Sequence, residues 1–171
     1  MRNRLLTVFV ICFSLVSFAQ NISSIDFGIK NLGITVDGYF KTFTIEANFD
    51  SNNKLKSLFG KVKVESLRTG IENRDEHLLE EEYFNANKHE FITLKSTAIN
   101  EKSENYYLVS VALTIKGKTK SMIIPVTLKE QSESVQINSD FKINRRDFNV
   151  GGSSFIMSNT VKISVVHYQD L

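Results

Sequence analysis

The chain has 171 residues, of which 42% are hydrophobic and 23% charged, and its formal net charge is +2. Arg2 and Arg4 supply that excess, because residues 1–19 hold no acidic side chain and leave residues 20–171 without net charge. This balance argues against a nucleic-acid-binding protein and against attraction to an anionic membrane surface.

The N-terminal segment has the pattern of an export signal. Arg2 and Arg4 form a positive region, residues 5–16 are apolar, and Ser17-Phe18-Ala19 ends in the small residue that a signal peptidase reads. We expect residues 1–19 to be a removed signal peptide and the mature protein to be periplasmic or secreted. The apolar run of about a dozen residues is short of the roughly 20 that a membrane-spanning helix needs, so no stable membrane anchor is expected.

Cys12 is the single cysteine, and it lies inside this segment. A lipoprotein signal would normally place a small residue before it, whereas Ile11 stands there. Because Cys12 is the single cysteine, residues 20–171 contain none for a disulfide or a thiol site. They suit one domain, since there is one proline and no repeat or low-complexity linker.

Alternating apolar and polar residues dominate the mature chain. Tyr107, Val109, Val111, Leu113 and Ile115, for example, share one face of a half-buried strand. Eight such stretches follow one another along the chain: 25–30, 38–49, 58–65, 92–99, 107–115, 122–128, 135–143 and 161–165. The pattern predicts an all-β protein, an antiparallel barrel of about eight strands that closes on itself and so leaves no free edge.

One segment breaks this period. Residues 72–83 are rich in Glu and Leu, which predicts a short helix between strands, with Thr69 as its N-cap and Glu72 completing a capping box. Ile71, Leu78 and Phe84 would face the barrel. Asp75 and His77 are two residues apart and would point to different faces of the helix, so no metal site is expected.

Enzymatic signatures are missing from the sequence. There is no nucleophile elbow and no glycine-rich phosphate loop, and the carboxylates of residues 80–82 are neighbours that cannot converge on one bond. We expect a noncatalytic protein that needs no cofactor.

Four separated motifs resemble the signature regions of the YceI-like family. They lie in order along nearly the whole mature chain, in the stretches 23–40, 69–84, 113–120 and 141–148. The second and fourth contain the following residues: Thr69, Gly70, Arg74, Asp75, His77, Leu78, Phe141, Arg145, Asp147 and Phe148. Four positions depart from the family pattern: Ile22, Asn31, Asn149 and the pair His89-Glu90.

The resemblance implies a lipocalin-like barrel with a helix over one side and an elongated apolar lumen for a polyisoprenoid or another long-chain amphiphile. Arg74 with Asp75 and Arg145 with Asp147 are interpreted as structural pairs that bond each other or nearby backbone groups. His77 is expected near the barrel mouth. The four departures leave the head group of any ligand open.

Strand parity predicts which residues face the lumen. The expected lining residues are Phe43, Ile45, Val62, Val64, Val109, Val111, Leu113, Ile124, Val126, Ile163 and Val165. Phe40 and Phe59 have the opposite parity and are expected to pack under the helix or against loops. Alternation alone does not distinguish an open lumen from a solid core, because both need apolar residues inside.

The leading hypothesis is an exported carrier or scavenger that binds a long apolar chain, an isoprenoid or lipid-like small molecule, inside the barrel. The alternative is a secreted, noncatalytic interaction module with a packed barrel, for which exposed apolar residues at 155–157 would be the sign. A homodimer is compatible with either hypothesis.

Overall fold

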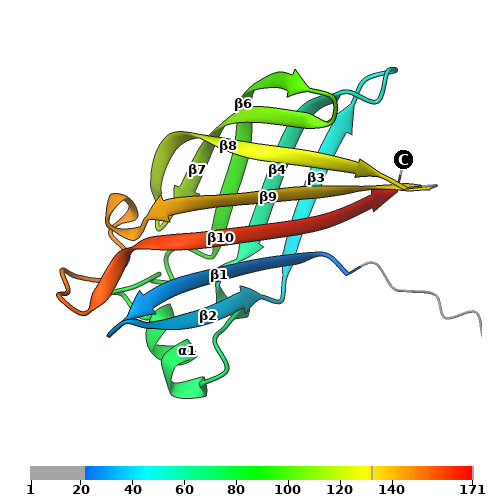
Figure 1. Ribbon diagram of the computed structural model, residues 1–171. Coiled ribbons are helices and arrows are strands. Elements are labelled where there is room, and N and C mark those ends of the chain that lie inside the picture. The colour runs from blue at the N-terminus through cyan, green and yellow to red at the C-terminus, as the bar shows by residue number, and fades with distance from the viewer. Residues whose placement is uncertain (1–21, 132, 171) are drawn as a thin grey trace, which may run out of the picture.

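The computed structural model describes residues 22–131 and 133–170, so the predicted signal peptide lies outside the described residues. Antiparallel strands curl into a barrel, and one α-helix lies at its lower edge in Figure 1. This confirms the predicted fold class. The strands are β1 (Ser24–Asn31), β2 (Ile34–Phe40), β3 (Phe43–Phe49), β4 (Leu55–Lys63), β5 (Leu67–Arg68), β6 (Phe91–Ser103), β7 (Tyr106–Ile115), β8 (Lys118–Glu130), β9 (Ser134–Asn144) and β10 (Met157–Asp170).

The ten strands form eight continuous ones, because β2 runs on into β3 and β4 runs on into β5. Their pairing order is β3-β4-β6-β7-β8-β9-β10-β1-β2-β5, with β3 and β5 at its ends. At a shared corner the Lys41 N–H donates to Ser66 O (3.1 Å) and the Lys63 N–H to Thr42 O (2.9 Å). These bonds join β2 to β3 and β4 to β5 as two bent strands. The bent pair lies between β1 and β6, so the order of strands closes.

The bend also changes which residues face inward. Both Lys41 and Thr42 are exposed, so the inward side is even-numbered in β2 and odd-numbered in β3. Strand parity over 38–49, taken as one strand, places Phe40 and Phe43 on opposite faces of the sheet. That assignment was wrong, because two consecutive outward residues bring Phe40 and Phe43 to the same side of the sheet, where both join one apolar cluster.

Strands β8 and β9 pair over only part of their length. The ladder runs from Glu130↔Val135 to Thr127↔Asn138 and stops there. Pro125 lies just beyond, and it has no N–H to donate to a further rung. The Ser139 hydroxyl donates to the Pro125 carbonyl at 2.7 Å instead. The two strands therefore separate toward the short 3-10 helix η2 (Arg145–Phe148), which follows β9.

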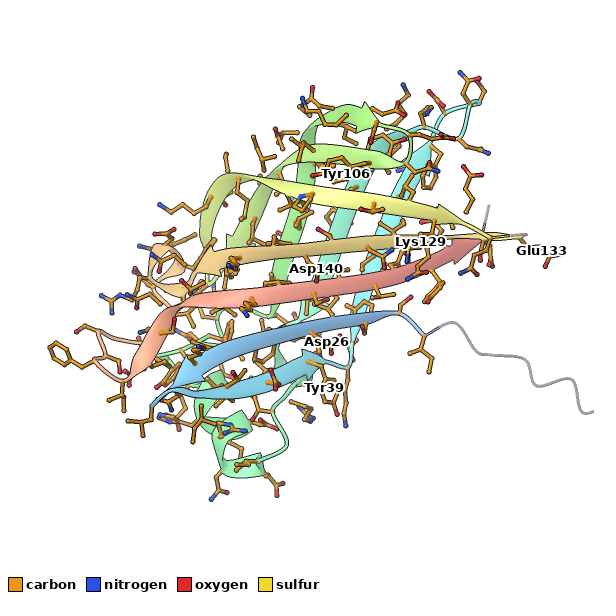
Figure 2. All side chains as sticks on the ribbon, viewed as in Figure 1. Asp26, Tyr39, Tyr106, Lys129, Glu133 and Asp140 are labelled. Atoms are coloured by element: carbon orange, nitrogen blue, oxygen red, sulfur yellow. The ribbon has the colours of Figure 1, made fainter. Side chains whose placement is uncertain are left out.

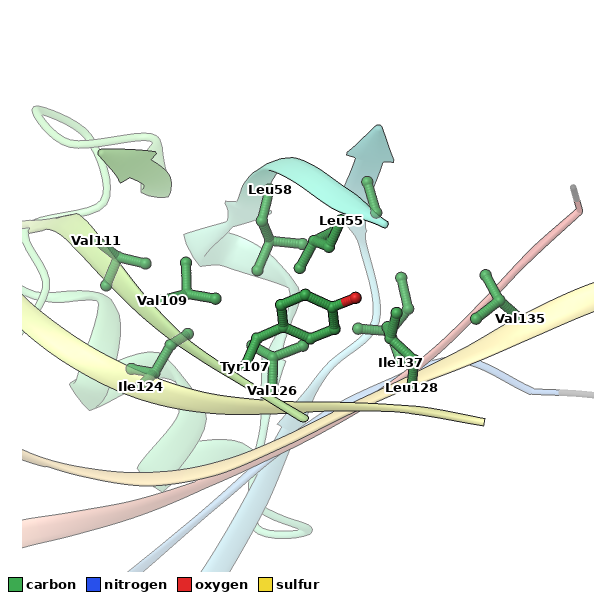
Figure 3. Close-up of a cluster of buried hydrophobic side chains, with 11 residues drawn as sticks. Leu55, Leu58, Tyr107, Val109, Val111, Ile124, Val126, Leu128, Val135 and Ile137 are labelled. Atoms are coloured by element: carbon green, nitrogen blue, oxygen red, sulfur yellow. The ribbon is translucent and has the colours of Figure 1, made fainter. Parts of the chain in front are cut away.

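One end of the barrel is packed solid. The ring of Tyr107 lies at the centre of Figure 3, surrounded by aliphatic side chains of β4, β7, β8 and β9. Val109, Val111 and Val126 in this cluster have 0% exposure. Burial of this kind contributes about 1.5 to 3 kcal/mol for each large apolar side chain, and it anchors the sheet at this end.

The hydroxyl of Tyr107 is buried there and has no hydrogen-bond partner among the described residues. Removing it in Tyr107→Phe should raise the free energy of unfolding by about 1 kcal/mol, since an unpaired buried hydroxyl is costly. Urea unfolding measures the change. Tyr106→Phe is the matched control: Tyr106 is exposed, its hydroxyl can bond water, and stability should not change. A loss of stability in Tyr107→Phe would mean that the Tyr107 hydroxyl does have a hydrogen-bond partner.

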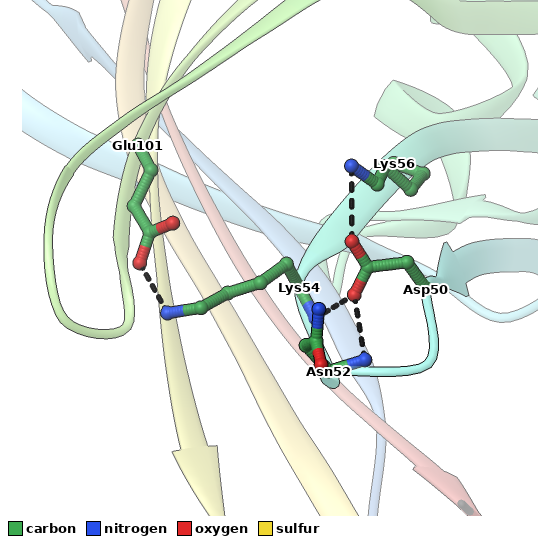
Figure 4. A network of polar contacts seen from close by, with 5 residues as sticks. All are labelled: Asp50, Asn52, Lys54, Lys56 and Glu101. Carbon is green, nitrogen blue, oxygen red and sulfur yellow. Dashed lines mark hydrogen bonds and ion pairs between the residues drawn. The ribbon is translucent and has the colours of Figure 1, made fainter.

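A charged network closes the turn between β3 and β4 (Figure 4). Asp50 Oδ1 accepts from the backbone N–H groups of Asn52 and Lys54, each at 2.9 Å, and Asp50 Oδ2 pairs with Lys56 at 3.0 Å. The Lys54 backbone bond and then the Lys56 side chain lower the pKa of Asp50 from 3.8 to about 2. The network is therefore intact above about pH 4 and is lost as pH falls through about 2.

The helix α1 (Glu72–Leu79) is shorter than the predicted 72–83, and its N-cap is Ile71. The side chain of Ile71 is exposed, so its predicted packing against the barrel was wrong, because this residue precedes the helix in an extended conformation. The predicted capping box does not form, because Thr69 bonds other groups, described below. Beyond Leu79 the chain leaves the helix as turns, and Tyr83 and Phe84 pack on the cluster of Leu113 and Ile115. No helix within residues 22–131 and 133–170 is long and apolar enough to cross a membrane.

Candidate ligand-binding cavity

A cavity of about 410 Å³ occupies the barrel between the packed end and helix α1. This volume falls within the range of about 300 to 1,000 Å³ that is usual for small-molecule sites. Leu58, Ile124 and Ile137 belong both to the packed cluster and to the cavity wall, so they form its floor. The wall is mostly aliphatic and aromatic. An apolar ligand could therefore replace unfavourable contact with water by van der Waals contact.

Six of the eleven predicted lining residues do line this cavity. They are Ile45, Val62, Leu113, Ile124, Ile163 and Val165. The remaining five are elsewhere. Val109, Val111 and Val126 are in the packed cluster, Val64 is buried in the 3-10 turn η1 (Val64–Ser66), and Phe43 packs beside Val62 and Leu67. Strand parity puts Val109, Val111 and Val126 on the inner face, where they are buried, but it does not separate the filled end from the hollow one.

Several wall residues are not among those that strand parity predicts. The main additions are Ile25, Phe27, Phe40, Phe59, Ile92, Leu94 and Ile143. Alternation in 25–30 could have identified Ile25 and Phe27, since Asp26 between them is exposed. Figure 2 labels Asp26 on β1, Tyr39 on β2 and Asp140 on β9, all exposed positions that alternate with wall residues. Phe40 was missed because of the corner after β2.

The segment from α1 to β6 covers the cavity at the end away from the packed cluster. Leu78, Tyr83 and Phe84 contribute apolar side chains to the wall. His77 lines the edge of the cavity, as expected for a residue near the mouth, but it is exposed. Its Nδ1 lies 2.9 Å from Glu80 Oε2, and its ring centroid is 5.0 Å from that of Tyr83.

Arg74 and Asp75 fasten this cover to the end of β5. The Thr69 N–H donates to Asp75 Oδ1 at 2.8 Å, and the Thr69 hydroxyl donates to the same oxygen. Arg74 Nε donates to the Thr69 hydroxyl at 2.7 Å and Arg74 Nη2 to the Thr69 carbonyl at 2.8 Å. Gly70 permits the tight connection, with φ at 83°. The side chains of Arg74 and Asp75 therefore both form hydrogen bonds with Thr69, through its backbone and its hydroxyl.

Asp75→Ala should lower the free energy of unfolding by about 1 to 2 kcal/mol, because two donors of Thr69 lose a charged acceptor that is 8% exposed. Thermal unfolding measures the loss. Glu76→Ala removes the same charge from an exposed position on the same helix and should leave stability unchanged. An Asp75→Ala protein with unchanged melting temperature and abolished lipid binding would assign Asp75 to the ligand instead.

Arg145 is the most buried charged side chain of the wall, with 3% exposure. Arg145 Nε donates to Ser158 O at 2.9 Å, and Nη1 donates to Val150 O (2.9 Å) and Gly152 O (3.0 Å). Burial lowers the pKa of this guanidinium, which still remains charged at neutral pH. Its partner in the sequence motif, Asp147, is exposed, whereas Phe141 and Phe148 line the cavity.

Three polar atoms of the wall are buried without a hydrogen-bond partner in the part of the chain that the structure describes: Asn31 Oδ1, Arg145 Nη2 and His167 Nε2. His167 Nδ1 lies 3.1 Å from Ser23 Oγ, and the Tyr168 N–H donates to the same oxygen at 3.0 Å. Burial lowers the pKa of His167, so the ring is neutral at neutral pH. The residues of this apolar wall thus carry a few buried polar atoms with unused bonding capacity.

Within residues 22–131 and 133–170, no three His, Cys, Asp or Glu side chains gather as metal ligands. The arrangement that the wall offers is a hydrophobic enclosure with isolated polar contacts. Such a wall can hold and orient an amphiphile.

Comparison with known proteins gives consistent matches. A protein family described as the YceI-like domain matches residues 17–167. A UPF0312 protein of Photorhabdus laumondii is 31% identical over 133 residues, which cover 73% of this chain and 69% of that protein. A UPF0312 protein of Vibrio cholerae is 31% identical over 104 residues. That alignment covers 60% of this chain and only 55% of the relative.

Solved structures share the fold. Burkholderia cenocepacia BcnA superimposes with a TM-score of 0.81 at 26% identity, covering 86% of this chain and 96% of its own. A Campylobacter jejuni YceI protein gives 0.76 at 20% identity, with 97% and 99% covered. A polyisoprenoid binding domain from Saccharophagus degradans gives 0.70 at 14% identity, with 90% and 97% covered.

Proposed function

Since this chain belongs to the YceI-like family, we propose that it is an exported, noncatalytic carrier that binds a long apolar chain inside its barrel. The main support for this proposal is the cavity of about 410 Å³ with its largely apolar wall. A fold shared with the polyisoprenoid binding domain of Saccharophagus degradans adds support for an isoprenoid or a similar long-chain molecule. Export rests on the N-terminal pattern of charge, apolar run and small residues.

The energetics favour a ligand with a long chain. Each buried methylene contributes about 0.8 kcal/mol, whereas association costs roughly 4 to 15 kcal/mol. A chain of about a dozen carbons therefore offsets much of this cost without a strong polar contact. Affinity should rise with chain length until the cavity is full.

Two measurements test the carrier proposal. Native mass spectrometry of protein purified from its own cell envelope should show a copurifying adduct of lipid-like mass. Titration of the delipidated protein with primary alcohols of increasing length should show affinity rising up to about fourfold per methylene. Absence of binding at every length would overturn the proposal.

A second candidate is a noncatalytic interaction module, and one surface favours it. Phe155 and Ile156, in the loop before β10, are exposed although both are large and apolar. Large apolar residues on the outside of a barrel are typical of protein contacts. Failure of every lipid titration, together with loss of a protein complex in Phe155→Ser, would favour this candidate. The homodimer stays a prediction.

A further inference from the structure

The side chain of Arg145 is fixed at the cavity wall by neutral groups only. Its three hydrogen bonds go to the carbonyls of Ser158, Val150 and Gly152. Among the described residues, no carboxylate lies within ion-pair distance of this guanidinium. A buried cation is costly unless an anion or several hydrogen bonds compensate it, and here the compensation is incomplete.

The remaining amino group of this side chain is unused. Nη2 is buried and has no hydrogen-bond partner in residues 22–131 and 133–170, while Arg145 lines the cavity. Leaving a buried charged donor unpaired costs more than leaving a neutral one unpaired. Of the three wall residues with an unpartnered polar atom, Arg145 alone combines a positive charge with almost complete burial.

The loop after η2 is shaped around this guanidinium. Asn149 and Gly151 have φ values of 56° and 67°, and the Gly151 N–H donates to Glu82 O at 3.0 Å. A Cβ at position 151 would lie 3.0 Å from Arg145 Nη1 and 3.1 Å from Tyr83 Cε1. The guanidinium is therefore enclosed between this loop and Tyr83, which restricts it from turning toward bulk water.

We propose that Arg145 Nη2 binds an oxyanion on the head group of the ligand, a carboxylate or a phosphate. This inference rests on the proposed carrier function and specifies its ligand class as an anionic amphiphile. Charged hydrogen bonds of arginine to carboxylate and phosphate are about twice as strong as neutral ones, and the planar fork matches either anion.

The position of Arg145 also sets the direction of the ligand. Ile137, in the cavity floor, is eight residues before Arg145 along β9 and its continuation, a span of roughly 26 Å at about 3.3 Å per residue. With its head at Arg145, the ligand chain runs between these points, toward Leu58 and Ile124. The head group lies at the η2 end.

Three probes with the same 16-carbon chain test the inference: hexadecan-1-ol, hexadecanoate and hexadecyl phosphate. Each is titrated into the delipidated full-length protein at about pH 8, where both acids are ionised. At least one anion should bind about tenfold or more tightly than the alcohol. In Arg145→Gln the anion and the alcohol should bind with affinities within about twofold of each other. Arg146→Gln removes the same charge from an exposed neighbouring position and should keep the preference.

The outcomes separate the two proposals. If the alcohol binds as tightly as both anions, the head-group assignment is overturned and the carrier function stands. If none of the three binds, the carrier function itself fails. A preference that persists in Arg145→Gln also overturns the assignment. If that variant does not fold, the comparison of the three probes on the unmodified protein still tests the head-group assignment. The anion that binds more tightly shows whether the head group is a carboxylate or a phosphate.

Discussion

Val165→Phe is expected to lower the affinity for a 16-carbon alcohol about tenfold while leaving the free energy of unfolding within about 1 kcal/mol of the parent value. Val165 lies on β10, opposite Ile25 of β1 and Ser139 of β9, and all three line the cavity. A phenyl ring there extends into empty space and replaces part of the ligand. Tenfold corresponds to about 1.4 kcal/mol, less than the burial of two methylenes.

Fluorescence titration and urea unfolding on the same preparation measure both quantities. The result to expect is a shorter optimum chain length as well as weaker binding, because the added ring shortens the space available. Unchanged lipid affinity would place the binding site elsewhere. A large loss of stability would mean that the cavity is closed by side-chain motion in solution.

Val111→Phe makes the same substitution at the packed end, and the opposite pattern is expected. Val111 has 0% exposure and lies in the filled cluster around Tyr107. The larger ring has no empty space to enter, so overpacking should cost about 2 to 3 kcal/mol. The protein that remains folded should bind the alcohol with nearly the affinity of the parent.

The pair of valine variants is informative because the chemical change is identical. Stability should fall only at Val111 and affinity only at Val165. If Val111→Phe is tolerated and loses lipid affinity instead, the cavity extends past Leu58 and Ile124 into the region that the structure fills. Equal loss of stability at both sites would indicate a barrel that is solid throughout.

The sequence by itself determined the fold class, because strand alternation is a local property. On β7 the buried positions are Tyr107, Val109, Val111, Leu113 and Ile115, as alternation predicts. Two-residue periodicity puts every second side chain on the same side whatever lies across the barrel. The YceI-like motifs were likewise visible in the sequence, and the family match agrees with them.

Tertiary structure decided what these inward residues do. Val111 and Leu113 are two residues apart on the same face of β7, yet one is enclosed in the packed cluster and the other lines the cavity. The difference lies in the side chains that reach them from other strands, which no local pattern contains. The corner at Lys41 and Thr42 is similar, since hydrogen bonds to the distant β4–β5 segment establish it.

Arg145 illustrates the same limit at the candidate head-group site. Its interpretation as a residue that bonds backbone groups agrees with the bonds of Nε and Nη1. That Nη2 stays unpaired depends on where β10, the loop after η2 and Tyr83 lie in space. A sequence states which donors a residue carries, but only the folded chain determines which acceptors come within reach, because these acceptors arrive from separate segments.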